Sequence, residues 1–74
     1  MPPLPVLTSK QLVRLLLKLG YCIVRQRGSH IRLRAVGRKS VTVPKHDEIS
    51  VGVLRKIMRD VPLETSELLK LLED

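Results

Sequence analysis

The feature that most constrains the fold is a short run in which apolar and polar residues alternate. Its apolar members are Ile31, Leu33 and Ala35, and its polar members are His30, Arg32 and Arg34. Successive side chains of a β-strand point to opposite faces. The run therefore predicts a strand that covers a core with one face and offers imidazole and guanidinium groups on the other.

A strand is predicted on each side of this run. Residues 21–27 form a cluster of β-favouring residues, and Gly28-Ser29 forms a tight turn before the alternating strand. Gly37-Arg38 supplies a second turn, and residues 40–43 make a third short strand that Pro44 ends. Short links of this kind predict a three-stranded antiparallel meander.

An amphipathic helix is predicted before the strands. Thr8 and Gln11 have the spacing of a capping box. The leucines that follow recur at i, i+3, i+4 and i+7, namely Leu12, Leu15, Leu16 and Leu19. Gly20 is the expected C-terminal stop of this helix.

Two further helices are predicted after the strands. The first has Ser50 as its N-cap and Pro62 at its end, with an apolar stripe of Val51, Leu54, Ile57 or Met58, and Val61. The second, within residues 64–74, is acidic and rich in leucine. It either docks on the domain or binds another chain.

The element order predicts an α+β fold of two layers, with helices on one face of a small sheet. The 74 residues form one domain. Residues 1–7, with three prolines, are expected to be a loose N-terminal extension, and residues 64–74 an appended helix.

The charge balance predicts an anionic partner. Lys and Arg number 14 against 7 Asp and Glu, a formal net charge of +7. Nucleic acid, an acidic protein or a membrane surface would suit that field, and the alternative is that the charge only keeps the chain soluble.

The remaining composition restricts location and chemistry. Cys22 is the only cysteine, which excludes an intrachain disulfide and a thiolate zinc site, and we expect it to be a small buried hydrophobe. No signal peptide, membrane span or metal-ligand spacing is evident, so a cytoplasmic protein without cofactor is expected.

Four short motifs give the chain a family resemblance. In order they are Gly-Ser-His at 28–30, Val-Thr-Val-Pro at 41–44, Glu-Ile at 48–49 and Gly-x-Leu-Arg-x-Ile at 52–57. Together they resemble the HicA toxins, also labelled YcfA-like, which are the ribonuclease halves of HicA/HicB toxin–antitoxin pairs. The resemblance extends over roughly residues 9–63.

The resemblance implies a fold similar to the double-stranded RNA-binding domain, with an α-β-β-β-α order. It also implies cleavage of mRNA, a catalytic histidine at His30, and neutralisation by a HicB-like antitoxin that covers the active face. Relatives often place a histidine near His46 as well.

The residues themselves suit metal-independent RNA cleavage. RNA carries its own nucleophile, the 2′-hydroxyl, and a histidine is suited to moving its proton near neutral pH. His30 is the predicted general base, and the basic residues expected to hold phosphate are Arg32, Arg34, Arg27, Lys39 and Lys45.

Three nearby residues have two readings each. Gly28 and Ser29 either serve the turn alone or also orient a phosphate. His46 is either a solvated loop histidine or, if its loop folds back to the sheet, a second proton-transfer group.

Two other functions remain open from the residues. The same basic sheet could belong to an RNA-binding module without catalysis, in which case His30 is a surface histidine after a turn. A DNA-binding helical module fits less well, because the arginines cluster on extended segments.

Overall fold

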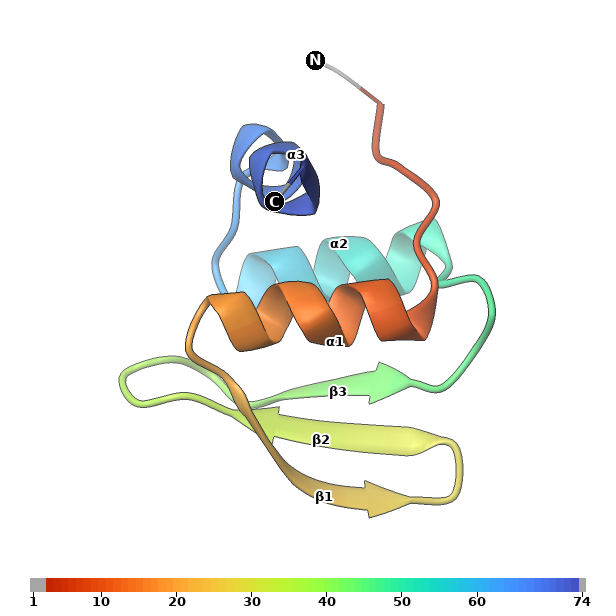
Figure 1. Cartoon of the computed structure of the whole chain (residues 1–74), viewed down its shortest axis with the longest axis vertical. Helices are drawn as coiled ribbons and strands as arrows, with labels where there is room; N and C mark the ends of the chain where they lie inside the picture. The colour runs from red at the N-terminus through yellow and green to blue at the C-terminus, as the bar shows by residue number, and fades with distance from the viewer. Residues whose placement is uncertain (1–2, 74) are drawn as a thin grey trace.

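The computed structural model describes residues 3–73 (Figure 1). Its elements, in chain order, are α1 (Ser9–Lys18), β1 (Cys22–Arg27), β2 (His30–Arg34), β3 (Val41–Pro44), α2 (Val51–Asp60) and α3 (Thr65–Glu73). The α+β class and the predicted α-β-β-β-α order with an extra C-terminal helix are confirmed.

The three strands form one antiparallel sheet in the order β1-β2-β3. Helices α1 and α2 lie side by side on one face of the sheet, and α3 lies on the far side of these helices (Figure 1). The opposite face of the sheet has no helix over it. The sheet is thus covered on one side only, as the alternation in β2 predicted.

The core is aliphatic and lies between the sheet and the helices. In β2 Ile31 and Leu33 are buried, and in β3 Val41 and Val43 are buried. Among residues 3–73 no charged side chain is buried. All charged side chains of these residues therefore reach the surface.

Both ends of α1 are fixed by the residues that predicted them. Gln11 N donates to Thr8 Oγ1 (3.1 Å) and Thr8 N donates to Gln11 Oε1 (2.9 Å), which completes a capping box. At the other end Gly20 takes a φ of 97°, and Tyr21 N donates to Leu16 O (3.0 Å). This is a Schellman ending, for which glycine is the preferred residue.

Two predictions about single residues are wrong. Cys22, expected to be buried, is exposed, because the strand register pairs it with the exposed Arg34, on the face of the sheet that no helix covers. Its neighbour Tyr21 is buried instead and donates its hydroxyl to Lys39 O (2.8 Å). Val51, expected on the apolar stripe of α2, is 52% exposed because it begins the helix, whereas Leu54 and Ile57 are buried as predicted.

The two ends of the described chain pack on the domain. Leu7 is buried, and its carbonyl accepts the N–H of Ile49 (2.7 Å), so this part of the 1–7 extension belongs to the core. Residues 1 and 2 lie outside the described part. In α3 Leu68 is fully buried and Leu72 half-buried, which shows that this helix docks on the domain.

Candidate functional site

A bulge in β1 decides which residues share the open face of the sheet. Ile23 opposes Leu33, but the next registered pair is Arg25 with Arg32, so Val24 is the extra residue. Directly opposed residues of antiparallel strands lie on the same face. The bulge therefore moves Arg25 and, two residues on, Arg27 to the side of the sheet that carries Arg32.

The open face combines a histidine with four arginines from two strands. Its members, all exposed, are Arg25 and Arg27 of β1 and His30, Arg32 and Arg34 of β2; we call them the basic face. Strand β3 adds Thr42 and Pro44 to the same face, because Thr42 opposes Arg32 and Pro44 opposes His30. The register assigns both Arg25 and Arg27 to this face.

His30 is positioned by the turn that precedes it. Gly28 takes a φ of 57°, whereas Ser29, like every non-glycine residue of the described chain, does not have a positive φ. A positive φ at the first central residue alone is the pattern of a two-residue type II′ hairpin turn. Arg27 and His30 close this turn as directly opposed partners. The imidazole thus stands between a guanidinium on β1 and Pro44 on β3.

The arginines of the basic face repel one another. Arg25 and Arg32 are directly opposed, an arrangement of like charges that destabilises a sheet. Arg32 turns toward β3, where its Nη1 donates to Thr42 Oγ1 (2.9 Å). Fold stability does not explain such a cluster, whereas an anion bound to it would relieve the repulsion.

A groove of about 350 Å³ adjoins the basic face between β3 and α2. It is lined by both histidines and by residues of the sheet and of α2, among them His30, Arg32, Thr42, His46, Lys56 and Asp60. Lys56 and Asp60 form an ion pair of 3.5 Å one helical turn apart on α2. Sequence analysis missed this helical wall, since nothing in the pattern of α2 shows which of its polar residues faces the sheet edge.

The connector after β3 folds back toward the turn that carries His30. Lys45 N donates to Ser29 O (2.6 Å), and His46 N donates to Pro44 O (2.9 Å). The carbonyl of His46 accepts the N–H of Ser9 (3.0 Å) at the start of α1. These bonds bring His46 into the groove that His30 also lines.

The other predicted site residues divide between the two ends of the sheet. Lys45 is exposed beside Ser29, at the end of the sheet that carries His30. Lys39 lies in the β2–β3 connection at the opposite end, and it lines no part of the groove. The structure thus groups Arg27, Arg32 and Lys45 near the histidine and separates Lys39 from it.

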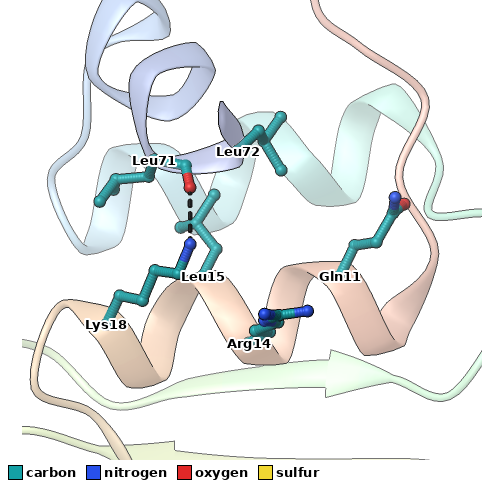
Figure 2. Close-up of a pocket in the computed structure, with 6 residues that line it drawn as sticks. All are labelled: Gln11, Arg14, Leu15, Lys18, Leu71 and Leu72. Atoms are coloured by element: carbon teal, nitrogen blue, oxygen red, sulfur yellow. Dashed lines mark hydrogen bonds between the residues drawn. The ribbon is translucent and has the colours of Figure 1, made fainter. Parts of the chain in front are cut away.

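A second cavity, of about 320 Å³, lies between α1 and α3 (Figure 2). It is lined by Gln11, Arg14, Leu15, Lys18, Leu71 and Leu72. Lys18 Nζ reaches across it to donate to Leu71 O (2.9 Å), which satisfies a carbonyl in the last turn of α3. The cavity contains no histidine or carboxylate, so its polar groups suit the docking of α3 better than proton transfer.

Residues 3–73 contain neither a metal-binding cluster nor a membrane-spanning helix. No group of three or more His, Cys, Asp or Glu side chains is arranged to hold a metal ion. Within the same residues no helix is long and apolar enough to cross a membrane.

Fold and site together define a small α+β domain with a basic, histidine-bearing sheet face. The family described as HicA toxin of bacterial toxin-antitoxin matches residues 9–63, from the start of α1 to just before α3. The chain therefore belongs to the HicA toxin family. A search of curated proteins finds no match.

Proposed function

We propose that the protein is a metal-independent endoribonuclease that cleaves mRNA in the cytoplasm and is silenced by a HicB-like antitoxin. Membership of the HicA toxin family supports the toxin role. The observation that carries the ribonuclease role is the register that sets His30 among the four arginines of the basic face.

The proposed reaction uses the nucleophile that RNA supplies. His30, as general base, removes the proton of a 2′-hydroxyl while that oxygen attacks the adjacent phosphorus. The bond from phosphorus to the 5′-oxygen breaks, leaving a 2′,3′-cyclic phosphate and a 5′-hydroxyl end. Arg27, opposed to His30 on β1, and Arg32, two residues further along β2, are suited to binding the phosphate as its negative charge grows.

The basic face also suits a protein partner that silences the toxin. Four exposed arginines invite acidic groups, and a partner that covers them would exclude RNA. Binding of the antitoxin and of RNA should therefore be mutually exclusive.

The test compares His30→Ala with wild type on RNA in the presence of a chelator. Removing a general base lowers the cleavage rate about 10²- to 10⁴-fold. Gln26→Ala is the matched control, because Gln26 precedes Arg27 on β1 but opposes the buried Ile31, on the other face of the sheet. New 5′-hydroxyl ends, labelled with a polynucleotide kinase, report the expected chemistry.

Two results would contradict the proposal. Equal RNA loss with wild type and His30→Ala would remove His30 from the chemistry. RNA binding by both proteins without cleavage by either would favour the alternative, a non-catalytic RNA-binding module that uses the same face.

A further inference from the structure

The groove between β3 and α2 contains a second histidine for which the ribonuclease reaction has a use. Cleavage requires a base for the 2′-hydroxyl and an acid for the departing 5′-oxygen. His30 is assigned to the first step, and the other four members of the basic face are arginines, which do not give up a proton in proteins. The acid must therefore come from outside that face.

His46 is held where such an acid is needed. Its position is two residues beyond Pro44, the β3 residue registered opposite His30. The residue between them, Lys45, donates its N–H to the carbonyl of Ser29, next to His30. The pairing of Pro44 with His30 and the bond from Lys45 to Ser29 thus fix the path of the chain from Pro44 to His46.

The backbone of His46 is anchored even though the residue lies outside helix and strand. Its N–H is bonded to Pro44 O at 2.9 Å and its carbonyl to Ser9 N at 3.0 Å, the latter joining it to the first residue of α1. Its exposed side chain lines the same groove as His30. A histidine in an unconstrained loop would have neither anchor.

The groove also supplies a cation on its helical wall. Lys56 of α2, an exposed lysine, lines it opposite the sheet and pairs at 3.5 Å with the half-buried Asp60. Arg32 lines the sheet side. A phosphodiester in the groove would then meet a cation on the helical wall, a cation on the sheet side and both histidines.

Resting on the proposed ribonuclease function, we infer that His46 is the general acid that protonates the leaving 5′-oxygen. As the O2′–P bond forms, His30 takes the 2′ proton, and as the P–O5′ bond breaks, the His46 imidazolium gives its proton to that oxygen. The products are a cyclic phosphate and a free 5′-hydroxyl. Proton exchange with water restores both histidines, so no further reactant is consumed.

A change of leaving group separates this role from a merely structural one. In an RNA oligonucleotide whose 5′-oxygen at the cleaved linkage is replaced by sulfur, the departing thiolate needs no proton. On the ordinary linkage His46→Ala should lower the cleavage rate about 10²- to 10⁴-fold. On the sulfur linkage the cleavage rate of His46→Ala should lie within about tenfold of the wild-type rate.

Two further variants complete the experiment. His30→Ala should remain defective on both linkages, because removal of the 2′ proton is still required. Asp47→Asn is the matched control, since Asp47 follows His46 in the same connector and does not line the groove. Circular dichroism establishes that every variant is folded.

The outcomes distinguish the two proposals. If His46→Ala cleaves ordinary RNA at the wild-type rate, or is equally defective on both linkages, His46 is not the acid, and the role of His30 is unaffected. If wild type cleaves neither substrate, the ribonuclease proposal fails and the inference fails with it.

Discussion

The two faces of β2 differ in the burial and in the polarity of their side chains. On the covered face Ile31 is 8% exposed and Leu33 is fully buried, whereas His30, Arg32 and Arg34 on the other face are exposed. One strand therefore contributes alternate residues to the core and to the candidate site. The difference teaches that the core and the candidate site use separate residues of one strand, so substitutions at adjacent positions should affect stability and the candidate site separately.

The largest effect on stability is expected on the covered face. Leu33→Ala removes a fully buried side chain at the centre of the sheet and should lower the free energy of unfolding by about 2–5 kcal/mol. Urea denaturation followed by circular dichroism measures this loss. In a domain of 74 residues, a loss of that size is a large part of the total stability.

The matched variant for this comparison is Arg32→Ala, at the preceding position on the opposite face. Its exposed side chain leaves no cavity, so its unfolding free energy should stay within about 0.5 kcal/mol of wild type. Equal destabilisation by Leu33→Ala and Arg32→Ala would contradict the expected difference in stability between the two faces.

Much of this division could be predicted from sequence because period-two alternation is a local signal. The exposed positions of β2, the capping box at Thr8 and the end of α1 at Gly20 all depend on neighbouring residues, and all are confirmed. The resemblance to HicA toxins added the family, which the family match confirms.

What sequence could not provide depends on contacts between distant segments. The bulge at Val24 is set by pairing with β2, and it alone decides the face of Arg25 and Arg27. The exposure of Cys22 follows from its pairing with Arg34 on the open face of the sheet, which no pattern within β1 records. The presence of both histidines in one groove depends on the bonds that join the connector to Ser29 and Ser9.

A smaller effect is expected at Tyr21, which joins the covered side to the β2–β3 connection. Tyr21→Phe removes the hydrogen bond to the Lys39 carbonyl and should cost about 1 kcal/mol at pH 7. Denaturation at neutral pH measures that cost. No change would mean that water replaces the hydroxyl without loss.

The same variant has a pH dependence of known sign. Burial raises the pKa of Tyr21, and the nearby charge of Arg38 only partly opposes this effect. A raised pKa means that the folded state holds the proton more tightly, so the stabilisation is complete below the unfolded pKa of about 10 and is lost as pH rises above it. The stability difference between wild type and Tyr21→Phe should therefore shrink above about pH 10, whereas a constant difference would contradict the burial effect.

The smallest effect on stability is expected on the open face, at the end farthest from His30. Arg34 is exposed and registered opposite Cys22, so Arg34→Ala should change the unfolding free energy by less than about 0.5 kcal/mol. Its effect should appear in RNA binding instead. If Arg34 contacts one phosphate of single-stranded RNA, its loss should reduce the slope of log K against log salt by about 0.7.

The measurement uses His30→Ala as the background, so that binding is followed without cleavage. Arg55→Ala is the control, because Arg55 is an exposed arginine of α2 that carries the same charge but lies off the sheet and does not line the groove. A smaller slope for Arg34→Ala alone would tie the phosphate contact to the basic face. Equal slopes for the two variants would mean that net charge, and not the position of the arginines on β2, governs the attraction of RNA, and the two faces of the strand would then differ in burial only.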